Sequence, residues 1–126
     1  MNILITGAGS GIGKGIAQGL CQAKHRLIVT DYNKEAAMAV AGQLVEAGYQ
    51  ASGAQLDIAD PAAVEDVETL IDSAGFGPVD VLINNAGLQH VAPLEEFDMD
   101  KWAYLVQVML TGVAGLTRAL LPQMRA

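Results

Sequence analysis

Short apolar runs and helix-type patterns of apolar residues alternate along the first two thirds of the chain. The runs have the length and the β-branched content of buried strands, and they lie within residues 2–6, 27–30, 50–57 and 79–83. The patterns between them space apolar residues three or four apart, at Ile12, Ile16 and Leu20, at Ala37, Val40, Ala41, Leu44 and Val45, and at Val64, Val67 and Ile71. This alternation predicts βαβ units and therefore a parallel sheet covered by helices.

Polar and turn-forming residues predict where these helices begin and end. Asn33 can cap the second helix, and Gly48 follows its last apolar position as a stop. Asp60-Pro61 has the form of an N-cap followed by a proline at the first helical position. The chain from Gly75 to Pro78 is predicted to turn into the fourth strand.

The last segment predicts a long helix, capped by Asp98 and running from about Met99 towards Met124 (residues 99–124). One face is expected to hold large apolar residues, namely Trp102, Leu105, Val106, Met109, Val113, Leu116 and Leu120. A second face of apolar or small residues contains Val108, Gly112 and Gly115. A helix buried on one side only would carry more charge, so we expect a second covered face, against another subunit or against further chain. This helix is therefore the expected contact of a homo-oligomer.

Right-handed crossovers between the predicted strands give the spatial order 3-2-1-4. The predicted fold class is therefore α/β: part of a doubly wound parallel sheet, Rossmann-like, in one domain that spans residues 1–126. A ligand crevice is expected at the carboxyl ends of strands 1 and 4, where the strand order reverses. Four separate stretches end there, namely Thr6 to Gly13, Asp31, Asp57 and Asn84 to Gly87.

The loop after the first strand is rich in glycine and reads Gly7-Ala8-Gly9-Ser10-Gly11-Ile12-Gly13. A strand, a glycine turn and a helix in this order hold phosphate, because free backbone N–H groups at the helix start face its oxygens. The spacing departs from G-x-G-x-x-G, since Ile12 stands where that pattern needs its third glycine. The alternative is a tight turn that needs positive φ and binds nothing.

Asp31 strengthens the nucleotide interpretation. It ends the second apolar run, 18 residues after Gly13, near the spacing expected for a carboxylate that hydrogen-bonds a ribose 2′-hydroxyl. A carboxylate at this position would repel a 2′-phosphate, which favours NAD over NADP. The alternative is that Asp31 only begins a loop.

Composition and charge narrow the function classes. The chain is 52% hydrophobic with a net charge of −7 and no basic cluster, which predicts a well-packed domain and argues against nucleic acid. Cys21 is the single cysteine and is expected to serve packing. Met1 is not followed by a basic leader, and Gln107 and Arg118 interrupt the apolar stretch Leu105–Leu121. We therefore expect neither a signal peptide nor a membrane span, and a cytoplasmic location.

The remaining lone polar residues predict little chemistry. No set of His, Cys and carboxylate residues has the spacing of metal ligands, so no metal is predicted. His25 is expected to be solvated, and Lys14 and Lys101 to be surface charges. His90 is expected on a loop surface, with a place in a substrate pocket as the alternative.

Taken together, these stretches resemble the classical short-chain dehydrogenases/reductases over essentially the whole chain. The glycine loop is similar to the TGxxxGIG loop of that family, and Leu56-Asp57 to its adenine-contacting aspartate after strand 3. Asn84-Asn85-Ala86-Gly87 is similar to its NNAG motif after strand 4. The last helix, with Leu110-Thr111-Gly112, resembles its central interface helix.

The resemblance implies an NAD site and assigns its residues. Asp31 would hold the ribose hydroxyls, Asp57 the adenine edge, and the N–H groups from Ser10 to Gly13 the pyrophosphate. Ala86 and Gly87 would leave room beside the cofactor. The implied cofactor-binding set is Gly7, Ser10, Gly11, Ile12, Gly13, Asp31, Asp57, Ile58, Asn85, Ala86 and Gly87.

Within that family, the segment from Gly87 to Pro93, with Glu95-Glu96-Phe97 and Lys101-Trp102, looks most like D-3-hydroxybutyrate dehydrogenases. In those enzymes a glutamine at the position of Gln89 helps to hold the substrate carboxylate. The resemblance therefore implies a small hydroxy acid substrate, with 3-hydroxybutyrate as the specific expectation.

Two departures from the family concern catalysis. The family uses a serine and a Tyr-x-x-x-Lys pair, but Tyr32, Tyr49 and Tyr104 each lack a lysine four residues later. The family also has a relay asparagine where this chain has Met109, whose thioether is a poor hydrogen-bond partner and is expected to be core filler. No catalytic residue is therefore assigned.

These observations support an amino-terminal NAD-binding half of a short-chain oxidoreductase, with negligible turnover on its own. A non-catalytic NAD-binding module and a self-associating interaction protein are the alternatives outside the enzyme class. Within that class the alternative is a 3-ketoacyl reductase, which typically uses NADPH and against which Asp31 argues.

Overall fold

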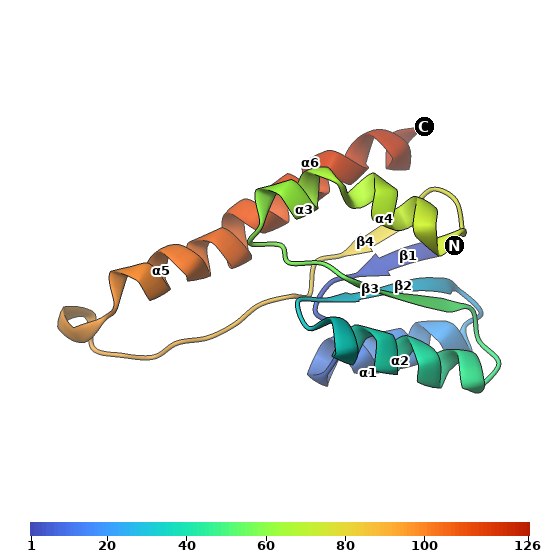
Figure 1. Cartoon of the computed structure of the whole chain (residues 1–126), viewed down its shortest axis with the longest axis horizontal. Coiled ribbons are helices and arrows are strands. Elements are labelled where there is room, and N and C mark those ends of the chain that lie inside the picture. Colours follow the sequence, from blue (N-terminus) through green and yellow to red (C-terminus); the bar gives the residue numbers. More distant parts are fainter.

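The computed structural model of the chain describes all residues from 1 to 126. One parallel sheet is formed by four strands, which are β1 (Asn2–Ile5), β2 (Arg26–Asp31), β3 (Ala51–Gln55) and β4 (Val81–Ile83). Their order is β3-β2-β1-β4, with Ile3 of β1 beside Leu27 of β2 and Val81 of β4. The predicted Rossmann-like order 3-2-1-4 is thereby confirmed (Figure 1).

Helices cover both faces of this sheet. The helices α1 (Gly11–Gln22) and α2 (Lys34–Glu46) cover one face, and α3 (Pro61–Glu65), α4 (Val67–Ala74) and α6 (Gly112–Arg125) cover the other (Figure 1). Each layer has its own core of eleven buried residues, because the strands bury side chains on both faces. Ile3, Ile5 and Leu27 belong to the first core, and Leu4 and Ile28 to the second.

Helix α1 packs on the sheet with a different face from the one predicted. Its buried residues are Gly13, Ala17 and Cys21, whereas Ile12 is 79% exposed. Ile16 and Leu20 pack only at the margin of the core. The small residues let the helix approach the sheet closely, and this gain outweighs the larger side chains one position away. The predicted packing role of Cys21 is confirmed.

The predicted third helix is two helices. The chain bends at Asp66, which has φ −90° and ψ 12°, and its carboxylate accepts a hydrogen bond from the Thr69 hydroxyl at 2.7 Å. Val64, Val67 and Ile71 are all buried as expected. The predicted caps are also found, since the Asn33 side chain accepts from the Ala36 N–H and that of Asp60 from the Ala62 N–H.

The fourth strand, Val81–Ile83, is shorter than the predicted run of residues 79–83, because the Asp80 side chain bonds to the backbone of β1. Its carboxylate accepts a 2.7 Å hydrogen bond from the Asn2 N–H, and its own N–H donates to the Asn2 carbonyl oxygen at 2.8 Å. Asp80 therefore fastens the start of β4 to the start of β1. Val79, beside it, is buried in the second core.

The last helix runs continuously from Met99 to Arg125, as α5 (Met99–Val106), a π-helical stretch η2 (Gln107–Thr111) and α6. The residues that pack on the sheet are four apart, namely Val108, Gly112, Leu116 and Leu120. The predicted division into two faces is therefore wrong: Trp102, Val106 and Met109, assigned to the same face as Leu116, are exposed. When a helix is apolar on all sides, the spacing of its apolar residues does not indicate which face is buried.

By length and composition alone this helix could cross a membrane, with 27 residues and a mean hydropathy of 1.4 in an 18-residue window. Gln107 and Arg118, which were expected to interrupt the apolar stretch, do not lower its mean hydropathy enough to exclude a membrane span. In the fold, however, Leu116 and Leu120 are fully buried beneath the helix in the second core. We therefore explain part of the apolar character by packing on the sheet.

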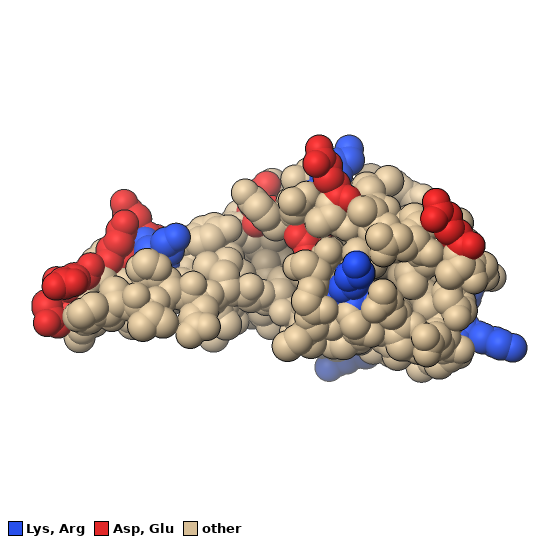
Figure 2. Space-filling model, turned by 90° about the horizontal axis from the view of Figure 1, so that it is seen from below, with Lys and Arg blue, Asp and Glu red and all other residues tan.

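An arm projects from the body of the molecule. It consists of the loop after Gly87, the short 3-10 turn η1 (Leu94–Glu96) and α5, that is, residues 88–106 (Figure 1). No residue of α5 is buried. Acidic side chains gather at the outer end of the arm (Figure 2), where the exposed acidic residues are Glu95, Glu96, Asp98 and Asp100.

Candidate functional site

A cleft lies at the carboxyl ends of the strands, where the sequence predicted one. Its volume is about 530 Å³. The lining residues come from five separate stretches and are Gly7, Ser10, Gly11, Ile12, Asp31, Tyr32, Leu56, Asp57, Ile58, Asn85, Ala86, Gly87, Leu88, Tyr104 and Val108. Ten of the eleven residues in the predicted cofactor-binding set are among them, and Gly13 is the exception.

The glycine loop has the backbone geometry of a close-approach site. Gly7 has φ +64°, and a Cβ there would lie 2.7 Å from the Ala86 Cα, so this position must be glycine. Gly11 has φ +54° at the first turn of α1. Gly13 acts behind the cleft: a Cβ there would collide with the Gly7 carbonyl oxygen.

The start of α1 leaves backbone donors free. The Ser10 side chain makes no capping hydrogen bond, and the first N–H bonded to residue 10 is that of Lys14, which donates to the Ser10 carbonyl oxygen at 3.2 Å. The N–H groups of residues 11–13 therefore have no acceptor within the helix. With the helix dipole they form a site suited to an anion such as a phosphate.

Asp31 stands at the end of β2 with its carboxylate fixed in place. Its Oδ2 accepts a 2.9 Å hydrogen bond from the Gly9 N–H, and its Oδ1 accepts one of 2.9 Å from the Asn33 N–H. The side chain thus connects the glycine loop to the turn after β2. Each carboxylate oxygen has further lone pairs, so the group can still accept hydrogen bonds from a ligand.

Asp57 follows β3 in a comparable arrangement. Its Oδ1 accepts a 2.9 Å hydrogen bond from the Ala59 N–H. Leu56 and Ile58 on either side are 4% and 5% exposed, and they anchor the loop in the second core. This part of the cleft therefore offers one carboxylate beside apolar walls, which suits a flat base with an exocyclic amine.

The stretch after β4 closes the other side of the cleft. The Asn85 Nδ2 donates to the carbonyl oxygens of Thr6 and Gly7, both at 3.1 Å. The Thr6 hydroxyl oxygen in turn accepts from the N–H groups of Asn85 at 3.1 Å and Ala86 at 3.0 Å. Asn85 is therefore a structural bridge between two loops, and its amide is already engaged before any ligand arrives.

The arm carries the predicted substrate residue outside the cleft. Gln89 is exposed on the loop and does not line the cavity. His90 packs edge-on against Phe97 at a centroid distance of 5.2 Å, and Phe97 packs against Trp102 at 5.6 Å. These rings form a small cluster on the arm, a role for His90 that the sequence did not suggest.

Five residues that line the cleft do not belong to the set predicted from the sequence, namely Tyr32, Leu56, Leu88, Tyr104 and Val108. Tyr104 and Val108 are one helical turn apart and share a face, but this spacing alone does not indicate that the face lines the cleft. The pKa of the Tyr104 phenol is raised above its ordinary value, mainly by burial. The negative charge of Asp57 and the nearby Tyr32 raise it further. The Tyr104 hydroxyl is therefore protonated at neutral pH.

The titratable groups of the cleft gather on one side. Asp31, Tyr32, Asp57 and Tyr104 belong to the β2 and β3 ends or face them, whereas Gly87 and Leu88 beside β4 contribute none. Met109 is 49% exposed, and its Cε would lie 3.6 Å from a Cβ on Gly87. The predicted role of Met109 as core filler is therefore wrong, since the side chain is half exposed near Gly87 and the core is filled by Val108.

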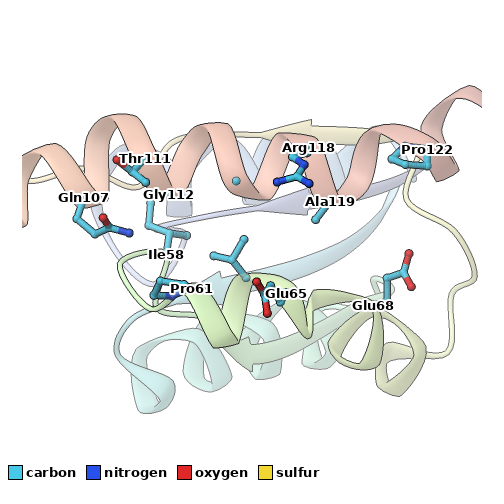
Figure 3. Close-up of a pocket in the computed structure, with 12 residues that line it drawn as sticks. Ile58, Pro61, Glu65, Glu68, Gln107, Thr111, Gly112, Arg118, Ala119 and Pro122 are labelled. Carbon is cyan, nitrogen blue, oxygen red and sulfur yellow. The ribbon is translucent and has the colours of Figure 1, made fainter.

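A second hollow, of about 450 Å³, lies between α6 and the pair α3 and α4 (Figure 3). Arg118 on α6 stands across it from Glu65 and Glu68. At Gly112 a Cβ would collide with the Ile58 carbonyl oxygen, so the helix approaches closely at one end. This hollow shares only Ile58 with the cleft, and we do not assign a nucleotide to it.

Comparison with known proteins agrees with this geometry. The family model described as short chain dehydrogenase matches residues 1–126. The uncharacterized oxidoreductase YxjF of Bacillus subtilis is 39% identical over 108 residues, which are 86% of this chain and 42% of that protein. The D-beta-hydroxybutyrate dehydrogenase of Cupriavidus necator is 37% identical, covering 97% of this chain and 47% of the enzyme. This chain thus spans less than half the length of these relatives.

Solved structures show the same fold with a nicotinamide cofactor bound. A gluconate 5-dehydrogenase from Burkholderia cenocepacia, in complex with NADP and tartrate, matches with a TM-score of 0.88 at 36% identity. The match covers 98% of this chain and 48% of the chain in that structure. A short chain dehydrogenase/reductase from Burkholderia phymatum, in complex with NAD, has a TM-score of 0.91 at 32% identity, with 98% and 43% covered. The family model matches the whole chain, and both the cleft and these relatives agree with that match. This chain therefore belongs to the short-chain dehydrogenase family.

Proposed function

We propose that this chain is the NAD-binding part of a short-chain oxidoreductase that acts on a small hydroxy acid. The observation that carries the proposal is the single cleft in which the glycine loop, Asp31, Asp57 and the stretch after β4 meet. The free N–H groups of α1 suit a pyrophosphate, and the two carboxylates suit the hydroxyls and the amine of an adenosine. When bound, the nicotinamide supplies hydride transfer, and the residues described here hold and orient the cofactor.

We propose NAD rather than NADP as the cofactor, because of Asp31. The carboxylate is fixed at the cleft by the Gly9 and Asn33 N–H groups, so it cannot swing away from a 2′-phosphate without losing two hydrogen bonds. Relatives with either cofactor bound are known, so membership of the family leaves the choice open.

Calorimetric titration with NAD and NADP tests this choice. We expect NAD to bind more tightly, and Asp31→Asn, which removes the charge but keeps an acceptor oxygen, to reduce the preference. Asp57→Asn is the matched control, because it should weaken both cofactors by the same factor. Tighter binding of NADP to the unchanged chain would contradict the proposal.

We further propose that these 126 residues turn over substrate negligibly on their own. No tyrosine has a lysine four positions later, and Met109 stands where the family places its relay asparagine. The loss of a general acid/base alone slows such reactions by about 10²–10⁴. The test is NADH formation with 3-hydroxybutyrate, and a rate typical of an intact dehydrogenase would refute the proposal.

The finer substrate proposal is 3-hydroxybutyrate. It is supported by the likeness of the arm to D-3-hydroxybutyrate dehydrogenases and by the Cupriavidus necator relative. A D-threitol dehydrogenase from Mycolicibacterium smegmatis matches at 35% identity, so polyols are the competing class. Titration of 3-hydroxybutyrate and of threitol into the NAD-saturated chain separates them, with Gln89→Ala expected to weaken only the binding of the acid.

We also propose that the last helix mediates self-association. Several of its apolar side chains are exposed, among them Trp102, Met109, Leu110 and Leu121. Acidic residues precede or begin the helix, while Arg118 and Arg125 lie near its end, so an antiparallel pair would bring opposite charges together. A two-fold contact between identical helices has this arrangement.

Light scattering at tens of micromolar tests the association. We expect a dimer or a larger assembly, and we expect Leu110→Glu to dissociate it because the charge would be buried in the contact. Met38→Glu is the control, since Met38 is 49% exposed on α2, away from this helix. A monomer of the unchanged chain would contradict the proposal.

A further inference from the structure

Tyr104 occupies a place that packing of the fold does not require. It belongs to α5, none of whose residues is buried, and yet it lines the cleft. Its side chain is 39% exposed. The residues that fasten the last helix to the sheet begin only at Val108, one turn later.

The neighbours of Tyr104 define which part of the cleft it faces. Tyr104 lines the same cleft as Asp57, whose negative charge acts on its phenol. Tyr32 is the other aromatic residue that lines this cleft. Ile58, which is almost fully buried, supplies an apolar surface beside Asp57. These surroundings suit a planar base. One face of the base can stack on the aromatic ring and the apolar surface, and an amine at its edge can donate a hydrogen bond to the carboxylate.

We propose that Tyr104 is a positioning residue for the adenine of the cofactor, closing the base-binding end of the cleft from the arm. The inference rests on the proposed NAD function and adds to it a residue that no motif indicates. It also gives α5 a role in the nucleotide site, because the arm then supplies one wall of it. The ring, and not the hydroxyl, is the part that acts.

Binding of AMP and of nicotinamide mononucleotide to the full chain tests this inference. Tyr104→Ala should weaken AMP binding about 5- to 150-fold, which is the range for one aromatic–base contact, and leave the binding of nicotinamide mononucleotide unchanged. Tyr104→Phe should keep the affinity for AMP. Val106→Ala, on the same helix but outside the cleft, is the control and should change neither ligand.

The outcomes separate this inference from the proposed function. If the unchanged chain binds AMP but Tyr104→Ala binds it equally well, the role of Tyr104 is refuted and the NAD site stands. A Tyr104→Phe variant as weak as Tyr104→Ala would show that the hydroxyl acts, which overturns the inference as stated. If the unchanged chain binds no adenine nucleotide, the proposed function fails and this inference fails with it.

Discussion

The body and the arm of this molecule are both rich in apolar residues, but they use them differently. In the body, Leu4, Ile5 and Ile28 are completely buried between two helical layers. In the arm, Leu94 is 76% exposed, Val91 81% and Met99 64%. Apolar content therefore does not decide whether a segment forms a core; a second layer to pack against does. The body buries its large apolar side chains within itself, whereas the arm leaves them exposed, where a ligand or another protein surface could cover them.

The largest effect expected from this difference concerns leucine truncation. Leu116→Ala should lower the free energy of unfolding by about 2–5 kcal/mol, because it opens a cavity in the second core. Leu94→Ala in the arm should change it by less than about 0.5 kcal/mol, since the side chain is already in water. Urea denaturation measures both. Equal losses would show that the arm is packed as tightly as the body.

Two glycines of α1 sharpen the comparison within the body itself. Gly13→Ala should destabilise by about 1–3 kcal/mol, because its Cβ would collide with the Gly7 carbonyl oxygen. Gly15→Ala is the matched control: nothing lies within 4 Å of its Cβ, so we expect a gain of about 0.5–1 kcal/mol. Thermal unfolding of the two variants reports the difference, and similar melting temperatures would argue against the close packing of α1.

The sequence predicted the sheet, the cleft and the packed faces of α2, α3 and α4, but not those of α1 and the last helix. Strand order follows from the alternation of elements and the handedness of crossovers, and motifs at strand ends converge by geometry. The face of α1 was missed because Gly13, Ala17 and Cys21 carry little hydrophobicity, although their small size is what the close approach requires.

Residues of the site that come from the arm could not be predicted. Tyr104 reaches the cleft only because the helix crosses the carboxyl ends of the strands, which no local pattern specifies. Gln89 lies exposed on the loop and does not line the cleft, so its predicted contact with a substrate stays a prediction. The motifs at the strand ends of the body lie together at the cleft as predicted. The position of the arm instead depends on tertiary contacts that no local pattern encodes.

Helix caps provide a smaller test of the same contrast. Asn33→Ala removes the acceptor for the Ala36 N–H and should cost about 1 kcal/mol of global stability, because α2 is part of a core. Asp98→Ala removes the acceptor for the Asp100 and Lys101 N–H groups, and should mainly increase hydrogen exchange within α5. An equal loss of global stability in both variants would show that the arm unfolds together with the body.

The smallest effect expected is a pH dependence from Cys21. Burial raises the pKa of this thiol above 9.0, its ordinary value, so the folded state keeps the proton where the unfolded state loses it. The stability is complete below pH 9.0 and declines as the pH rises through the folded pKa. Denaturation at pH 7 and pH 10 should show a smaller decline for Cys21→Ala than for the unchanged chain, and identical declines would contradict the assignment.

The bridge from Asn85 to the carbonyl oxygens of Thr6 and Gly7 has a consequence for biosynthesis. It joins groups 79 and 78 positions apart in sequence, so the glycine loop obtains its final support only after β4 has been made. A nascent chain that has just completed its first βα unit therefore has the phosphate-binding residues but not yet a rigid pocket for them. We expect cofactor capture on the ribosome to begin late, after the fourth strand emerges.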